Sequence, residues 1–438
     1  MGMNVRMRRA LVLNILLILV AGSAIAAVPV ESVEELRLPE NFEARRALKE
    51  LIVAPRREAM RSPERVIRQV VGAEAVRYEM RTQNGHFYLL FTNREDDEFA
   101  VYNRGSYIIK RRLDDGAFVQ VKVFYRSDPG FFVRMFPEGN RTVMDLYVGG
   151  VRTYRDVVIP ASFGSILIEP FAAVQRMTRD IIRWEELQRV ESLRAYESVA
   201  RMVETARREL PHLPDAEDGA MSADGSLVFI ESLVLQDQLP GFNCSGFAKW
   251  ICDGIAHPAT GSFLEIEPLK EKHLDLRGHQ WSRLQEEERD PYFGLDWSRN
   301  LARHIAAIEP DGSSGELPHP EALDVRSVPF SSYVEDVGFP VSELPRIMYF
   351  LALREPGHFY IASLSRDFGE DPPLRQHVHV AVLFPYFDAD GSFRTAVMER
   401  NVETSLESLE RRYGEDYIHL VRIRARRDFV PPRIRTTD

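Results

Sequence analysis

The residues best suited to covalent chemistry lie in the stretch FNCSGFAKWICDGI, residues 242–255, which holds both cysteines of the chain. The apolar spacing predicts a helix here, and Asn243 is a residue type that caps helix N-termini. Cys244 then falls in the first turn, where unpaired N–H groups favour thiolate over thiol. Because the thiolate is the nucleophilic form of cysteine, this position suits covalent catalysis.

The same stretch also suits a structural cysteine. Cys244 and Cys252 share one apolar helical stripe, and free cysteine is among the most buried residue types. Eight helical residues span about 12 Å, whereas a disulfide needs Cα atoms within about 7 Å, so the two thiols are not expected to pair. Gly246 is about 1 kcal/mol worse than alanine in a helix, which suggests that something approaches the backbone beside the sulfur. The helix alone favours a core cysteine.

A second segment supplies what a cysteine nucleophile requires, an imidazole base and a polar group that orients it. In HVHVAVLFPYFDADGSFRTAVMERN, His379 begins an apolar strand and DADG marks a turn. The returning strand ends near Glu399 and Asn401. Antiparallel pairing brings the end of the return strand close to the start of the first. Either Glu399 or Asn401 is therefore expected beside His379, and the sequence leaves the choice between them open.

Three short segments resemble the NlpC-type cell-wall peptidases of the papain-like superfamily. NCSGF at 243–247, with Trp250 beyond it, resembles the family motif D-C-S-G-F. Pro356-Gly357 resembles the P-G-D turn, and HVAVL at 379–383 resembles the H-V-G-I-Y strand. The resemblance implies a papain-like domain that acts on peptides of peptidoglycan without a cofactor.

In that resemblance Cys244 is the nucleophile and His379 is the base. The third position falls on the return strand, at Glu399 or Asn401. Gln238, six residues before Cys244, lies where papain-like enzymes keep a glutamine that donates to the developing oxyanion. Gln236 lies nearby in the same loop, so the position alone does not single out Gln238.

Departures from the family pattern support a rival interpretation. Asn243 replaces the usual acid of the first motif, and His358 replaces the acid of P-G-D. The interval of 135 residues from Cys244 to His379 is longer than in a compact NlpC domain, which implies an insertion at about 257–335. In the rival interpretation the domain is catalytically inactive and serves as a binding or scaffolding protein of the cell envelope.

Two further chemistries remain open. Transglutaminase-like enzymes use Cys, His and Asp in that order, and Asp388 or Asp390 would then be the acid, although the DADG turn already explains both. A metal site would combine His377 and His379 with His358. Zinc requires three or four converging ligands, and two histidines in one strand are weak evidence, so we predict no metal.

The elements that position these residues divide the chain into five parts. The sequence predicts a signal peptide at 1–27, a helical segment at 28–62, an antiparallel β domain of sandwich or barrel type at 63–170, a helical connector at 171–214 and the papain-like domain at 215–438. The predicted fold class is α+β. About 410 residues after removal of the leader exceed one hydrophobic core, in agreement with several domains.

Charge and the leader predict location and partners. The net charge of −10 argues against binding to nucleic acid or to anionic membrane surfaces. A basic start, an apolar run and the small residues Ala24 and Ala26 are typical of a secretory leader, with an uncleaved anchor as the alternative. Since no comparable apolar run follows, no membrane span is expected in the mature chain. We expect an exported protein, periplasmic or extracellular, whose partner is peptidoglycan or another peptide substrate. The sequence leaves the oligomeric state undetermined.

Overall fold

The computed structural model describes residues 38–184, 187, 193–237, 239–277, 290–309, 311–369, 375–389 and 391–434. The predicted leader at 1–27 lies outside the described residues, as do Gln238 and Asp390. Helices make up 28% and strands 32% of the structure, and the sheets are antiparallel, which confirms the α+β class. Within the described part of the chain, no helix is long and apolar enough to cross a bilayer.

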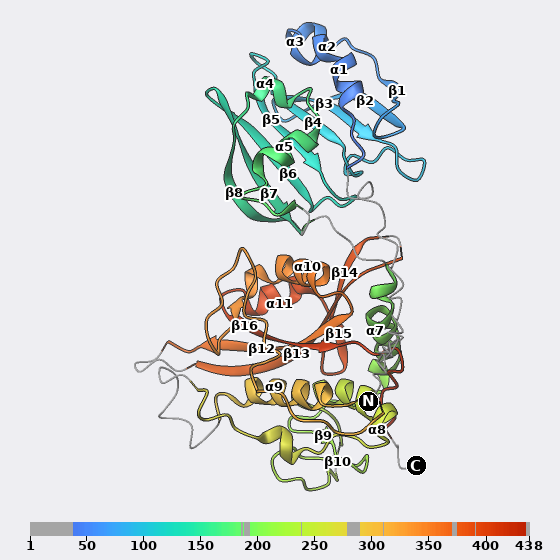
Figure 1. The fold of residues 1–438 in the computed structure, drawn as a ribbon, viewed down its shortest axis with the longest axis vertical. Coiled ribbons are helices and arrows are strands. Elements are labelled where there is room, and N and C mark those ends of the chain that lie inside the picture. The colour runs from blue at the N-terminus through green and yellow to red at the C-terminus, as the bar shows by residue number, and fades with distance from the viewer. Residues whose placement is uncertain are drawn as a thin grey trace, which may run out of the picture. The chain divides into compact units, whose positions relative to one another are not determined.

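The N-terminal part is an eight-stranded sheet preceded by short helices (Figure 1). The helices are α1 (Phe42–Ala47), α2 (Lys49–Val53) and α3 (Arg56–Ala59). The strands are β1 (Arg65–Arg68), β2 (Ala75–Gln83), β3 (His86–Asn93), β4 (Tyr107–Arg112), β5 (Phe118–Phe124), β6 (Phe132–Glu138), β7 (Arg141–Val148) and β8 (Val151–Ile159). Each strand pairs antiparallel with the next along the chain, so the module is one open meander and not a two-sheet sandwich. The tight turn at Asn84-Gly85, where both residues have positive φ, joins β2 to β3 as its sequence predicts.

In the connector predicted at 171–214, the described helices are α5 (Phe171–Thr178), η1 (Leu193–Ala195), α7 (Glu197–Glu209) and η2 (Leu210–His212). The short helix α4 (Phe163–Ile166) precedes this segment. In α7, Val199, Met202, Val203 and Ala206 are buried, and this i, i+3, i+4, i+7 spacing gives the helix one apolar face. That helix packs on a strand of the C-terminal sheet.

The C-terminal part is built on a six-stranded antiparallel sheet of order β11-β16-β12-β13-β14-β15. Its strands are β11 (Phe339–Pro340), β12 (His358–Asp367), β13 (Arg375–Phe387), β14 (Phe393–Glu399), β15 (Val402–Thr404) and β16 (Tyr417–Arg424). A separate two-stranded ribbon pairs β9 (Ala220–Met221) with β10 (Leu227–Val228). The helices are α8 (Cys244–Thr260), η3 (Glu267–Lys270), α9 (Phe293–Ala306), η4 (Val341–Glu343), α10 (Leu344–Arg354) and α11 (Leu406–Tyr413).

Helices cover both faces of this sheet (Figure 1). Along β13, Val380 and Val382 join the core that contains α8 and α9. The alternate residues Ala381 and Leu383 join the core that contains α10 and α11. Because β13 is buried on both faces, its sequence is a nearly continuous apolar run without polar alternation.

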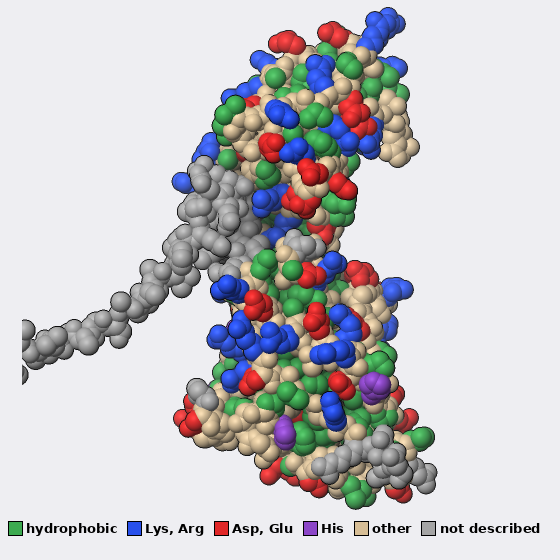
Figure 2. Space-filling view, turned by 90° about the vertical axis from the view of Figure 1, so that its right-hand side faces the viewer, with side chains coloured by type: hydrophobic (Ala, Val, Ile, Leu, Met, Phe, Trp, Pro, Cys, Tyr) green, Lys and Arg blue, Asp and Glu red, His purple; other side chains and the backbone are tan. Residues whose placement is uncertain are grey.

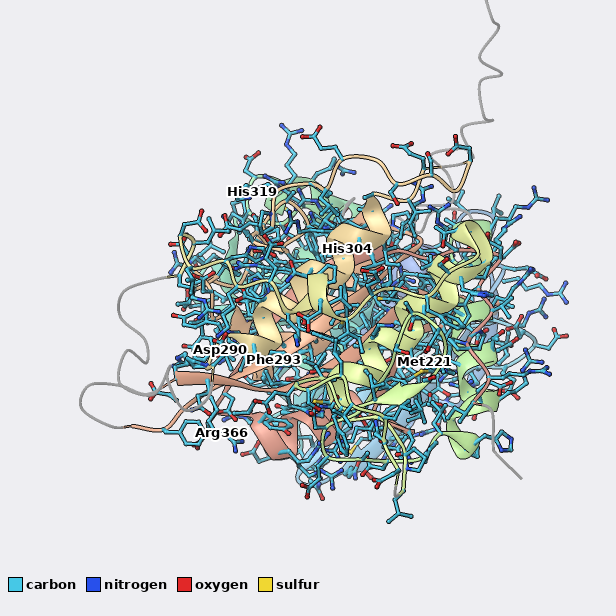
Figure 3. The ribbon with its side chains drawn as sticks, turned by 90° about the horizontal axis from the view of Figure 1, so that it is seen from below. Met221, Asp290, Phe293, His304, His319 and Arg366 are labelled. Atoms are coloured by element: carbon cyan, nitrogen blue, oxygen red, sulfur yellow. The ribbon has the colours of Figure 1, made fainter. Side chains whose placement is uncertain are left out.

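The segment at 257–335, expected as an insertion, contributes a core helix. Within it, α9 packs against α8, β12, β13 and β16. Trp297 of α9 is fully buried, and its Nε1 donates to the carbonyl of Ser245 at 2.9 Å. Figure 3 shows α9 running between its labelled residues Phe293 and His304. This part of the segment therefore supports the start of α8 directly.

Candidate catalytic site

Cys244 is the first residue of α8, as the N-cap prediction required. The Oδ1 of Asn243 accepts a hydrogen bond from the amide of Gly246 at 2.7 Å, and Asn243 itself has extended backbone. At the other end, Gly261 closes the helix in the left-handed conformation with φ of 79°. The sequence around Cys244 therefore fixes its place at the positive end of a 17-residue helix.

Gly246 allows a neighbouring backbone to touch the first turn of α8. A Cβ atom at this position would lie 1.8 Å from the carbonyl oxygen of Gly219, which is main chain and cannot rotate away. That same carbonyl accepts from the amide of Asn243 at 3.1 Å. The close approach that the sequence suggested is therefore the segment leading into β9.

The side chain of Cys244 is half-buried and packs against the main apolar core. Burial by itself would raise the pKa of the thiol, but hydrogen bonding to His379, the charge of that imidazole, the backbone N–H of Val380 and the charge of Arg400 together lower it. Cys252 is fully buried, and burial followed by the charge of Asp253 raises its pKa well above the ordinary value. The two cysteines of α8 thus have opposite electrostatics.

His379 links Cys244 to a carboxylate. Its Nε2 lies 2.7 Å from Oε2 of Glu399, which leaves Nδ1 for the sulfur. Burial opposes the charged ring, yet the contacts with Cys244 and Glu399 outweigh it and raise the pKa of His379 to about 9. The ring of Tyr413 stacks on the imidazole with centroids 6.0 Å apart. This environment favours the imidazolium form at neutral pH.

Glu399 is itself anchored by residues that follow β14. Its Oε1 accepts hydrogen bonds from Thr404 Oγ1 and from Arg412 Nη2. Burial would raise the pKa of Glu399, but the bonds from His379, Arg412 and Thr404 lower it to about 2. The carboxylate is therefore ionised throughout the physiological range and fixed at both oxygens.

Of the two candidates on the return strand, only Glu399 contacts His379. Asn401 lies past the end of β14, and its Nδ2 donates to the carbonyl of Leu213 at 2.9 Å. Gln238 lies outside the described residues. Gln236 is bonded within its own loop, to Val228 and Gly241, so its amide is committed there.

The other sequence candidates lie elsewhere. Asp388 accepts from the amide of Ala389 in the hairpin turn, at the opposite end of β13 from His379.

The histidines considered as metal ligands have other partners. His377 forms hydrogen bonds with Ser363 and with the carbonyl of Asp336. Burial is the main cause that lowers the pKa of His377 to about 3. His358 bonds to the carbonyl of Glu355. Among the described residues, no three His, Cys, Asp or Glu side chains converge as metal ligands.

Sequence reasoning missed three side chains of the site. Arg412 and Thr404 hold Glu399, and Tyr413 stacks on His379. Arg412 and Tyr413 end α11, whose sequence LESLERRY is that of an ordinary charged helix, so no local signal distinguishes them. Thr404 ends β15, which pairs with β14 and begins only three residues after Glu399, and that proximity was the one available clue.

Replacing Glu399 by glutamine is expected to lower the pKa of His379 by about one to three pH units, because the amide keeps the hydrogen bond but removes the adjacent charge. The ring would then lose its proton between about pH 6 and 8, whereas in the native protein it does so near pH 9. NMR titration of the imidazole carbon-bound protons measures this. Asp388→Asn, which removes a carboxylate from the same hairpin, serves as the control. An unchanged midpoint in Glu399→Gln would contradict the assignment.

The match between this chain and a known family lies in the N-terminal part. Residues 34–186 match the model of a family described as a domain of unknown function (DUF8515). No curated protein matches the chain, and no solved structure does. The matched residues include all eight strands of the N-terminal sheet and none of the candidate catalytic residues.

Proposed function

We propose that the chain is a cysteine hydrolase that cleaves amide bonds in peptides of peptidoglycan. The observation that carries the proposal is the continuous set of contacts from Cys244 through His379 to Glu399. A cysteine that only filled a core would not need a charged imidazole at its sulfur. Such a charge stabilises the thiolate, which is the form that attacks carbonyl carbon.

The reaction proceeds by acyl transfer. The thiolate of Cys244 forms a bond to the amide carbonyl carbon, and the carbonyl π electrons move onto oxygen. As the oxyanion collapses, the C–N bond breaks and the imidazolium of His379 gives its proton to the leaving nitrogen. Water then attacks the thioester, His379 takes the proton from that water, and the C–S bond breaks. The carboxylic acid product leaves, and the thiolate and imidazolium are restored.

The first turn of α8 offers donors for the oxyanion. Asn243 occupies the amide of Gly246, whereas the amides of Cys244 and Ser245 precede the first helical hydrogen bond and have no intrahelical acceptor. Together with the helix dipole, such amides stabilise negative charge that develops beside the sulfur. This arrangement supports hydrolysis without a metal ion.

Two features of the sequence support peptidoglycan peptides as the substrate class. The segments around Cys244, Pro356 and His379 resemble those of NlpC-type peptidases, and the N-terminal 27 residues have the pattern of a secretory leader. An exported hydrolase of peptide bonds with this resemblance meets peptidoglycan stem peptides. The rival hypothesis is a papain-like domain without catalytic activity. The two hypotheses predict different reactivity for the thiol of Cys244, which is high in a hydrolase and low in an inactive domain.

Iodoacetamide is expected to label Cys244 rapidly between pH 5 and 8, and at pH 6 at least about tenfold faster than an unperturbed thiol, which is below 1% thiolate at that pH. Cys252 serves as the internal control, since it is buried in the same helix and its pKa is raised. Mass spectrometry of the two cysteine peptides gives both rates from one sample. A Cys244 that reacts only after unfolding would favour the inactive rival.

One observation favours a second candidate, a transglutaminase-like acyl transferase. The group that orients His379 is a carboxylate, as in the Cys-His-Asp order of those enzymes, although it is Glu399 and not Asp388 or Asp390. The two functions share the thioester and differ in what resolves it. Adding a small primary amine to the reaction separates them, because a transferase forms the substituted amide and a hydrolase forms the free acid.

A further inference from the structure

The N-terminal sheet has one face that the helices cover and one that they leave open. Residues such as Val121, Val123 and Val133 belong to the main core with the helices α1, α4 and α5. Their neighbours along the same strands, Lys122 and Arg134, point to the other side because successive residues of a strand alternate. We call this second side the outer face.

Lys122 of β5 and Arg134 of β6 are directly opposite each other on the outer face. Like charges in this position destabilise a sheet. Both side chains are half-buried. Burial and then the charge of Arg134 lower the pKa of Lys122, so the protein holds two cations together where water solvates them poorly. The opposed charges destabilise the sheet, and the contacts of both cations with aromatic rings offset part of that cost.

Within the described residues, neither Lys122 nor Arg134 has a carboxylate within 4.0 Å, and the Nε of Arg134 is buried without a hydrogen-bond partner. Asp145 follows in the same cross-strand row, but its oxygens bond to Arg152 and to the amide of Asp156. On the face of the molecule drawn in Figure 2, Lys and Arg side chains lie among Asp and Glu side chains.

Aromatic rings pack against the two cations at cation–π distances. The Nζ of Lys122 lies 3.5 Å from the ring centroid of Phe132, and the guanidinium of Arg134 lies about 5 Å from the rings of Phe136 and Tyr147. Phe132 is only 9% exposed, so its ring is not free to stack on a sugar. The charged groups, and not the rings, are therefore what this face presents to a ligand.

We propose that Lys122 and Arg134 bind carboxylate groups of peptidoglycan stem peptides and so attach the protein to its polymeric substrate. Two adjacent cations that have no acidic partner among the described residues, one of them a guanidinium that forms two parallel bonds, match a carboxylate in charge and geometry. The choice of peptidoglycan among carboxylate-bearing polymers rests on the proposed hydrolase function. The charge complementarity of the face does not depend on that function.

The test is co-sedimentation of the full chain with insoluble peptidoglycan, using the Cys244→Ser form so that the polymer is not cleaved. The variant K122Q/R134Q is expected to bind at least about tenfold more weakly, because charge-assisted hydrogen bonds are lost. The control R112Q/R141Q removes two arginines of the same sheet that already pair with Asp115 and Glu138, and it should bind normally. The parent protein, with Lys122 and Arg134 intact, should also bind weakly to peptidoglycan whose carboxyl groups have been converted to neutral amides.

Each outcome decides between explanations. The unfolding temperature of K122Q/R134Q is measured beside its binding, because the substitutions remove both the opposed charges and the contacts with the rings. Weaker binding at a temperature where the variant is fully folded would not reflect unfolding. Equal binding by K122Q/R134Q and the parent would overturn the proposal. Preference of the face for soluble polyglutamate over peptidoglycan would also overturn it, in favour of an acidic protein partner. An inert Cys244 with intact, charge-dependent binding would reject the hydrolase alone.

Discussion

Replacing Cys244 by serine is expected to lower the rate constant for hydrolysis of peptidoglycan peptides by at least about 1000-fold. Serine changes the volume little and keeps a hydrogen-bond donor beside His379. The alcohol, however, lacks the low pKa that the charged imidazole gives the thiol. The imidazolium of His379 would then face a neutral hydroxyl, and no nucleophile would form at neutral pH. Release of new amino groups from purified stem peptides measures the rate.

Cys252→Ser is the matched control, because it makes the same atomic change two turns further along α8. That thiol is fully buried and takes no part in the contacts around His379, so the control should hydrolyse peptides at nearly the native rate, after any loss of stability is allowed for. Thermal unfolding of both variants separates lost chemistry from lost structure. Unchanged hydrolysis in Cys244→Ser would show that the nucleophile lies elsewhere.

Replacing Lys249 by methionine is expected to lower the free energy of unfolding by about 3–5 kcal/mol. Lys249 and Asp253 are both fully buried in α8, with Nζ and Oδ2 2.7 Å apart. Methionine fills a similar volume but leaves the carboxylate of Asp253 buried without its counter-ion. Burial already raises the pKa of Asp253. The loss should therefore shrink as pH falls, since a protonated Asp253 is less costly to bury. Urea unfolding at several pH values measures it.

The double variant K249M/D253N separates charge from packing. Asparagine removes the unpaired charge and keeps an oxygen that can accept the Leu264 amide, which Asp253 accepts at 2.8 Å. Much of the stability lost in Lys249→Met should return in the double variant. Lys272→Met is the control, because Lys272 is about half exposed and its ion pair with Asp290 contributes little. A double variant as unstable as the single one would show that packing, not charge, accounts for the loss.

Local features of the site followed from the sequence because they depend on neighbours in the chain. The cap of α8 needs only Asn243 and Gly246, which are three residues apart, and the hairpin of β13 and β14 needs only its turn and its apolar runs. The prediction of His379 as the base likewise depends on a local feature, its position at the start of an apolar strand. Short-range hydrogen bonds and periodicity fix such features whatever the remainder of the fold does.

The partners of those residues depended on contacts between distant segments. Glu399 and Asn401 are equally near the end of the hairpin in sequence, and only the folded chain directs Asn401 to Leu213 and Glu399 to His379. Likewise, an amphipathic pattern predicts a helix at α9 but cannot say which surface its apolar face meets. The tertiary structure places that face against α8 and the sheet.

The sequence by itself thus determined the fold class, the cap that presents Cys244 and the strand that carries His379. The tertiary structure alone decided that the two side chains meet, that Glu399 completes the set, and that Arg412 and Thr404 hold it. The physical reason is the range of the interactions. Backbone hydrogen bonds and apolar periodicity act over a few residues, whereas the charges that set the pKa of Cys244 come from β13 and the residue after β14, more than 130 residues away.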